Sequence, residues 1–323
     1  MSVKARAQAP EVAVGEAPGK LILFGEHSVA YGQPALGVAL SRGVRVKLRR
    51  GTGRVEVRLA DGVRFGTDTL AAKPAELVRA ALGAEADTID ADISIEVPPA
   101  AGLGSSAALA VALLRAKRSL RLEPPLAFEA LLQKAIAVED VAHGSSSGLD
   151  PAISILGTVV EFLRKPKKTP RSKAELKVKA LSPASSFHVV VGVLGHHGGT
   201  AVRVKAIAQQ RQRLGAPFDA AMRTLGSAAR AGIRAIASGD LETAGRTANL
   251  AHGVLAGLGL VSDEMEEIVR TARNAGAIGA KMSGAGGAGG AFFGLAADIR
   301  TANDILLAIE RGGAVGFIET AAD

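Results

Sequence analysis

The 323-residue sequence contains no cysteine and no tryptophan, and it has a single tyrosine. The absence of cysteine excludes disulfides and thiolate metal sites. Aromatic residues make up only 3% of the chain, which leaves few rings on which nucleic-acid bases could stack. No stretch of ~20 residues is apolar enough to span a membrane, and the N-terminus lacks the apolar core of a signal peptide. We therefore expect a cytoplasmic protein with no membrane partner.

The remaining composition is that of an ordinary globular protein, with 48% apolar and 22% charged residues. The length predicts two domains at roughly 100–200 residues each. Most of the net charge of +8 comes from residues 164–180, which hold eight Lys or Arg and one Glu. Pro166 and Pro170 interrupt this run, a pattern typical of a solvent-exposed turn or linker. We therefore expect no nucleic-acid partner.

The pattern of apolar residues predicts a mixture of strands and helices. The predicted strands cover residues 21–24, 44–48, 55–59, 93–97, 157–163, 174–181, 187–194, 291–295 and 314–319. The predicted helices cover residues 105–121, 126–141, 201–213, 218–237, 240–256, 262–275 and 299–311. Because strands and helices do not alternate regularly, the fold class is α+β rather than a doubly wound parallel sheet. A change of composition at residues 181–185 suggests a domain boundary.

The strongest chemical signal is PPAAGLGSSAA (98–108), between a predicted strand and a predicted helix. Gly102 and Gly104 would let backbone N–H groups approach an anion, and the helix N-terminus adds a positive partial charge. Ser105 and Ser106 supply hydroxyls for phosphate or Mg²⁺. A tight turn with a serine N-cap would explain only part of the segment. The pattern therefore favours a phosphate-binding loop, although it is not a Walker motif.

Two further segments carry charged residues beside glycine. In APGKLILFGEHSVAYG (17–32), Lys20 opens a predicted strand, and Glu26 and His27 follow it. By themselves these residues could be a solvated lysine and a plain turn. In VEDVAHGSSSGLD (138–150), Glu139 and Asp150 could hold a divalent cation and accept a hydroxyl proton. A capped helix end followed by an Asp-Pro turn explains that spacing equally well.

The fourth segment, KMSGAGGAGG (281–290), runs directly into the apolar strand AFFGL. A flexible linker is one interpretation, yet linkers seldom run straight into an apolar strand. A backbone that passes close to a ligand explains the glycines better.

Together the four segments resemble the GHMP kinase family, which includes galactokinases, homoserine kinases, mevalonate kinases and phosphomevalonate kinases. The resemblance extends from residue 17 to residue 295, with the motifs in the family's order. The two glycine-rich segments are similar to motifs of the whole superfamily, and the other two are most similar to its mevalonate-phosphorylating branch. Ala288 stands where the family usually has glycine, and LGHHGG before Thr200 is also unusual.

The resemblance implies a fold and an activity. The expected fold is α+β, with a ribosomal protein S5 domain 2-like N-terminal domain (1–182) and a ferredoxin-like C-terminal domain (183–323). The implied reaction is ATP-dependent phosphorylation of the C5 hydroxyl of mevalonate, a small-molecule substrate, with Mg²⁺ as cofactor. Phosphomevalonate kinase and mevalonate 3-kinase activities remain alternatives, as does a non-catalytic nucleotide or nucleic-acid binder. A homodimer is also left open.

The resemblance also assigns roles to individual residues. Asp150 matches the catalytic aspartate and Lys20 the lysine that pairs with it. The substrate residues are Glu26, His27 and Thr200, and the Mg²⁺ ligands are Ser106 and Glu139. The residues expected at the ATP phosphates are Ala101, Gly102, Leu103, Gly104, Ser105, Ser106, Ala107, Gly284, Ala285, Gly286 and Gly287.

Overall fold

The computed structural model describes residues 10–60, 64–65, 72–98, 100–144, 146–165, 174–195, 207, 209–286 and 289–321. By its internal contacts the chain divides into two compact units. The first unit comprises the chain up to Gly19, Arg42–Pro98 and Gly104–Ile155; the second comprises Lys20–Ser41, Pro99–Leu103 and Leu156–Asp323. Strands β1 (Ala13–Phe24) and β2 (Pro34–Arg50) contribute residues to both. The domain boundary expected at residue 182 stays a prediction.

In the first unit, the sheet is built around β5 (Ile89–Ile95). This strand pairs antiparallel with the end of β2, from Val44 opposite Ile95 to Arg50 opposite Ile89. It pairs parallel with β3 (Val55–Leu59), and β4 (Arg64–Phe65) follows at the edge. Buried and partly exposed residues alternate strictly along β5, as expected for a strand with one face on the core.

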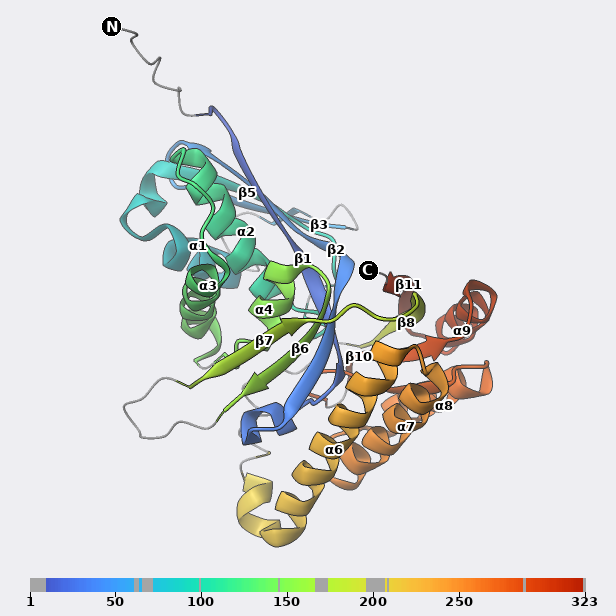
Figure 1. Cartoon of the computed structure of the whole chain (residues 1–323). Helices are drawn as coiled ribbons and strands as arrows, with labels where there is room; N and C mark the ends of the chain where they lie inside the picture. Colours follow the sequence, from blue (N-terminus) through green and yellow to red (C-terminus); the bar gives the residue numbers. More distant parts are fainter. Residues whose placement is uncertain are drawn as a thin grey trace, which may run out of the picture. The chain divides into compact units, whose positions relative to one another are not determined.

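Helices α1 (Ala72–Leu82), α2 (Ser105–Leu120) and α3 (Phe128–His143) pack on one another in the first unit (Figure 1). Helix α2 is rich in buried alanine, and its small side chains allow β1 to approach closely. A Cβ atom at Gly15 of β1 would lie 2.1 Å from the carbonyl oxygen of Ala112. Only glycine therefore fits where β1 crosses this helix.

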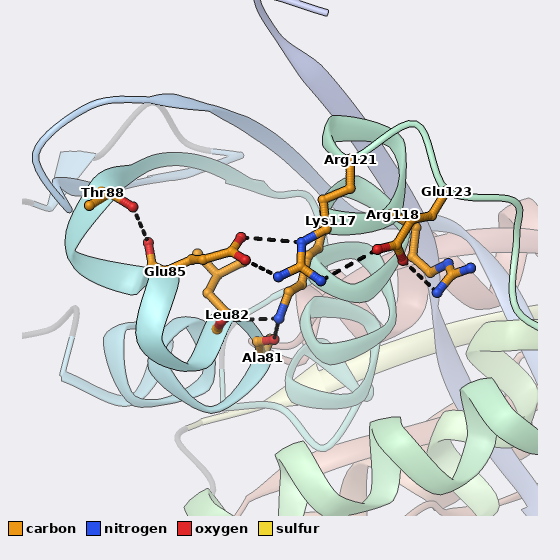
Figure 2. A network of polar contacts seen from close by, with 8 residues as sticks. All are labelled: Ala81, Leu82, Glu85, Thr88, Lys117, Arg118, Arg121 and Glu123. Carbon is orange, nitrogen blue, oxygen red and sulfur yellow. Dashed lines mark hydrogen bonds and ion pairs between the residues drawn. The ribbon is translucent and has the colours of Figure 1, made fainter. Parts of the chain in front are cut away.

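Polar contacts close the C-terminal end of α1 (Figure 2). The ammonium of Lys117 donates to the carbonyl oxygens of Ala81 and Leu82, at 2.9 and 3.0 Å. Arg121, one turn further along the chain, pairs with Glu85 just beyond α1. Cationic groups at a helix C-terminus satisfy its last carbonyls and complement its dipole. These contacts attach α1 to α2, the helix that begins at the predicted phosphate loop.

The second unit contains two sets of paired strands. The first half of β2 pairs antiparallel with β6 (Val159–Arg164), which pairs with β7 (Leu176–Ala180). A four-stranded antiparallel sheet has the order β11-β8-β10-β9. Its strands are β8 (Phe187–Leu194), β9 (Gly279–Met282), β10 (Gly290–Ala296) and β11 (Val315–Ala321).

Helices α6 (Ala216–Ser238), α7 (Leu241–Gly257), α8 (Asp263–Asn274) and α9 (Ile299–Arg311) complete the second unit (Figure 1). Helices α7, α8 and α9 pack against this sheet, and α6 packs against α7. Their apolar faces enclose a core that includes Phe218, Leu255, Phe292 and Ile305. Because the ring of Phe292 lies over Gly192 of β8, any side chain at Gly192 would collide with it.

Much of the predicted secondary structure is confirmed. Strands β3 and β8 and helix α9 have the predicted bounds. Helix α1 and strand β9 were not predicted, and most of the helix expected at 201–213 lies outside the described residues. Within the described part of the chain, no helix has the length and apolar character needed to cross a membrane.

Candidate active site

The predicted phosphate loop joins β5 to α2. Gly102 and Gly104 have φ angles of +80° and +76°, in the left-handed region that favours glycine. Gly104 is the N-cap of α2, and no side chain caps the helix. The alternative of a serine N-cap is therefore wrong: Ser105 and Ser106 are already the first two helical residues. The positive end of the helix dipole lies at the loop, an arrangement that favours phosphate.

Lys20 is tied to this loop. Its side chain lies in β1 and is only 3% exposed. The ammonium donates to the carbonyl oxygen of Gly102 at 2.9 Å, and the backbone N–H of Lys20 donates to that of Leu103 at 2.9 Å. The structure thus excludes the alternative of an ordinary solvated lysine. Leu103, like Ala101 and Ala107 nearby, is buried and anchors the loop.

The turn after β1 has an unusual backbone. His27 has φ +57° and ψ −47°, and the N–H of Ser28 donates to the carbonyl oxygen of Glu26. This i to i+2 hydrogen bond and positive φ define a γ-turn of the rare, strained kind centred on His27. Holding a residue other than glycine there costs of order 1–3 kcal/mol. Backbone strain of this size is concentrated at functional sites, so the alternative of a plain turn does not describe this segment.

The carboxylate of Glu26 is turned into the protein. Its side chain is 1% exposed and pairs with the ammonium of Lys281, whose side chain is fully buried. Lys281 also donates to the carbonyl oxygen of Met282 at 2.7 Å and lies 5.5 Å from the ring centroid of Phe293. Burial lowers the pKa of Lys281, and the charge of Glu26 opposes this shift. The sequence reasoning missed Lys281 as a site residue, although it is the one charge that precedes the long uncharged segment 282–297.

The imidazole of His27 lies beside the C-terminal glycine motif. Its Nε2 atom is buried and has no hydrogen-bond partner among the described residues. Burial, together with the charge of Lys281, lowers the pKa of His27 to about 4, against the opposing effect of a hydrogen bond with the backbone of Ala285. The ring is therefore neutral at pH 7. A neutral imidazole can accept a hydrogen bond from a hydroxyl group through its unprotonated nitrogen.

The motif itself is fixed rather than a free linker. Ser283 is buried; its hydroxyl accepts from the N–H of Ile22 at 3.1 Å and donates to the carbonyl oxygen of Ile22 at 2.8 Å. Gly284 and Gly286 have φ angles of +85° and +71°. A Cβ atom at Gly284 would lie 3.9 Å from the carbonyl oxygen of Gly102. The two glycine segments therefore lie close together, as a pair of phosphate-contacting loops requires.

The last turns of α3 and the first turn of α4 (Leu149–Leu156) carry the two candidate carboxylates. Helix α3 ends at His143 and is followed by its C-cap Gly144, whose φ is +75°; Glu139 lies in the last turns of the helix. The hydroxyl of Ser146 donates to Oε2 of Glu139 at 2.8 Å, and the hydroxyl of Ser147 accepts from the N–H of Leu149 at 3.2 Å. These contacts turn the chain directly into α4.

Asp150 thus lies in the first turn of a helix. The alternative of an Asp-Pro turn is wrong, because Pro151 is tolerated in a first helical turn, where its missing N–H has no helical partner. Acidic side chains are favoured in the first turn of a helix. Asp150 belongs to the first unit and Lys20 to the second, and their expected pairing stays a prediction.

Comparisons with known proteins identify the family. Residues 69–158 match the model for the GHMP kinases N-terminal domain, and residues 233–314 match that for the GHMP kinases C-terminal domain. The mevalonate kinase of Thermococcus gammatolerans is 32% identical, over 88% of this chain and 89% of that protein. The mevalonate kinase of Pyrococcus horikoshii is 32% identical, over 94% of each. The chain belongs to the GHMP kinase family.

Solved structures of GHMP kinases agree with this assignment. L. major mevalonate kinase in complex with R-mevalonate has a TM-score of 0.80 and 25% identity, covering 100% of this chain and 99% of that one. Streptococcus pneumoniae phosphomevalonate kinase, with a TM-score of 0.76 and 17% identity, covers 95% of this chain and 99% of that one, and shares the fold. The expected α+β GHMP kinase fold is confirmed.

The donor set suits the Mg²⁺ that the resemblance implies. No group of three acidic or histidine side chains that could hold a metal occurs among the described residues. Mg²⁺ bound with a nucleotide requires only one or two protein oxygens, because phosphate and water supply the rest. Glu139 offers a carboxylate and Ser106 a hydroxyl at the start of α2. The residues therefore fit this ion, while Thr200 and Gly287 lie outside the described residues.

Proposed function

We propose that this GHMP kinase transfers the γ-phosphoryl group of ATP to the C5 hydroxyl of mevalonate, releasing 5-phosphomevalonate and ADP. The observation that carries the proposal is about 32% identity to curated mevalonate kinases over most of the chain. The buried Lys20, the strained Glu26–His27 turn and Asp150 at the start of a helix support it, because each is an arrangement that a plain structural role does not require.

Phosphoryl transfer depends mainly on positioning and on neutralising charge. In the proposed site, the first N–H groups of α2 and the loop 101–107 bind the ATP phosphates, and the phosphate-binding role that the resemblance gives to Gly284, Ala285, Gly286 and Gly287 is kept. Ser106 and Glu139 would hold Mg²⁺, which neutralises phosphate charge when it is bound. The side chains of Ala101 and Leu103 are buried and keep the loop in place.

Asp150 acts as the general base in this proposal. Its carboxylate accepts the proton of the C5 hydroxyl as that oxygen forms a bond to the γ-phosphorus and the bond to the ADP oxygen breaks. Lys20 stabilises the negative charge that develops on the attacking oxygen. His27 and Thr200 orient the mevalonate.

An acceptor panel tests the proposal. Purified enzyme with ATP and Mg²⁺ is offered mevalonate, 5-phosphomevalonate, homoserine or galactose, and ADP release is followed. We expect the highest kcat/KM with mevalonate. A higher value with any other acceptor would overturn the proposal and favour the corresponding GHMP kinase activity.

The position of the new phosphate separates the 5-kinase from a 3-kinase. A phosphate on the primary C5 oxygen couples to two neighbouring methylene protons, so its ³¹P signal is a triplet without proton decoupling. A phosphate on the tertiary C3 oxygen has no such protons and gives a singlet. We expect the triplet.

A further inference from the structure

The ion pair between Lys281 and Glu26 joins two segments that are 255 residues apart in the sequence. One is the strained turn after β1, and the other is the end of β9, where the C-terminal glycine motif begins. Taking both charges out of water costs free energy, and apolar residues of the same size often stabilise a core at least equally. Stability alone therefore does not account for a fully buried ammonium at this position.

The pair is one of several links between these two segments. The hydroxyl of Ser283 makes two hydrogen bonds with the backbone of Ile22, before the turn. Glu26 pairs with Lys281 within the turn, and the ring of His27 meets the backbone of Ala285 beyond it. The glycine motif thus contacts the turn on both sides of Glu26.

Hydrogen bonds to side chains of a neighbouring helix hold the backbone on both sides of Lys281. The N–H of its neighbour Met282 donates to Nδ1 of His252 at 3.2 Å, and the N–H of Ala280 donates to the side-chain oxygen of Asn249 at 3.0 Å. Both acceptors lie on α7, which packs against β9. The backbone on both sides of Lys281 is therefore held in place, so its ammonium can determine the position of Glu26.

We propose that Lys281 is a positioning residue, which holds Glu26 so that the γ-turn forms and the unpartnered Nε2 atom of His27 is presented to the substrate hydroxyl. In this proposal Glu26 acts through His27, because its Oε1 atom is held in the ion pair with Lys281. The inference rests on the proposed function in one respect only, namely that His27 contacts mevalonate. It assigns to Lys281 a role distinct from binding the ATP phosphates.

Steady-state kinetics of Glu26→Gln and of the double variant Glu26→Gln with Lys281→Met test the role. The double variant removes both charges together, so it avoids the lone buried charge that Lys281→Met would create. We expect KM for mevalonate to rise about 10- to 100-fold, as for a misplaced binding group. KM for ATP should change by less than about twofold. An unchanged KM for mevalonate in the folded double variant would overturn the proposal.

A matched control is Glu319→Gln. Glu319 is also a buried carboxylate in the second unit, but it accepts hydrogen bonds from Ser41 and lies on β11. We expect this variant to lower the melting temperature and leave KM for mevalonate unchanged. An equal rise in KM here would show that loss of stability alone moves this parameter, and it would overturn the positioning role.

A cycle with His27→Ala identifies the residue through which Lys281 acts. If the pair acts through His27, the triple variant has the same KM for mevalonate as His27→Ala alone. If the increases in KM caused by His27→Ala and by the double variant multiply in the triple variant, the pair acts elsewhere and the proposal would be wrong.

A spectroscopic measurement keeps this inference separate from the proposed function. The titration of the His27 ring can be followed by NMR in the free protein, with His27→Ala to assign its signal. We expect the titration of His27 to shift in the Glu26→Gln, Lys281→Met variant, because the charge of Lys281, which lowers the pKa of His27 in the wild type, is lost and the ring is no longer held in the turn. An unchanged titration would overturn the positioning role. Failure of the wild-type enzyme to phosphorylate mevalonate would instead overturn the proposed function.

Discussion

Glu26 and Glu139 are both buried carboxylates of the candidate site, and different groups hold them. A fully buried lysine ammonium pairs with Glu26, whereas a serine hydroxyl is among the groups that hold Glu139. Glu26 belongs to the second unit, in a cluster that also contains His27, Lys281 and His252. Glu139 belongs to the first unit, in the short segment that leads to Asp150.

These different partners indicate different roles: Glu26 supports the structure of the site, and Glu139 takes part in its chemistry. An internal ammonium neutralises Glu26, and the pair is costly to break because a lone charge would remain buried. Carboxylate oxygens are ligands that Mg²⁺ takes in proteins, and Glu139 is the residue proposed for that role. We therefore expect changes in the cluster around Lys281 to reduce stability strongly, and changes near Asp150 to reduce turnover with little loss of stability.

The largest effect is expected for Asp150→Asn. Loss of a general base lowers kcat by about 10²- to 10⁴-fold, while the melting temperature should change by no more than a few degrees. Asp263→Asn is a matched control, because Asp263 is also an aspartate in the first turn of a helix. Turnover and thermal melting of both variants provide the measurement. A fully active Asp150→Asn enzyme would remove the distinction between the two regions.

Lys281→Met should have the largest effect on stability. We expect the free energy of unfolding to fall by about 3–5 kcal/mol, because Glu26 would be left buried and unpaired. Urea denaturation measures the change. Lys165→Met is the control, since Lys165 and Glu175 form an exposed pair at 2.8 Å, and breaking it should cost less than about 1 kcal/mol. Equal losses in the two variants would show that burial does not distinguish these pairs.

The pH dependence of stability should report on the buried cluster. Burial lowers the pKa of His252 from about 6.5 to about 4. As the pH falls from about 6.5 to about 4, the unfolded chain takes up this proton first, so the folded state loses stability, by about 3 kcal/mol for one such group. The contribution is fully present above pH 6.5. Urea denaturation of wild type and His252→Gln across this range measures it, and we expect a shallower slope for the variant; parallel curves would contradict the expectation.

Ser146→Ala should have the smallest effect. It removes a hydrogen bond to the carboxylate of Glu139, which is worth about 1.5–3 kcal/mol in unfolding free energy. Because Ser146 helps to hold the proposed metal ligand, KM for Mg²⁺-ATP should rise more than KM for mevalonate. A rise confined to mevalonate would place Glu139 on the substrate side of the site.

Local sequence patterns predicted those parts of the fold that depend on neighbouring residues. Strand 187–194 is a continuous apolar run, and helix 299–311 begins after Asp298, whose side chain accepts from the N–H of Thr301. Helix α4 was missed because the pattern GSSSGLDP is typical of a turn. The serine hydroxyls that redirect the chain there make their contacts with Glu139 and Leu149, and the composition alone does not reveal these partners.

The order of the four motifs and the residue types within them were enough to indicate the family. Each motif carries its chemical signal locally, as glycines beside a helix start or as carboxylates beside serines. Only the tertiary structure decided that Lys20 is buried against the phosphate loop, that His27 occupies a strained turn and that Lys281 neutralises Glu26. Such facts concern groups up to 255 residues apart, brought together by the burial of β1 and β9. The energy of a buried charge depends on which partner folding places beside it, and no local pattern specifies that partner.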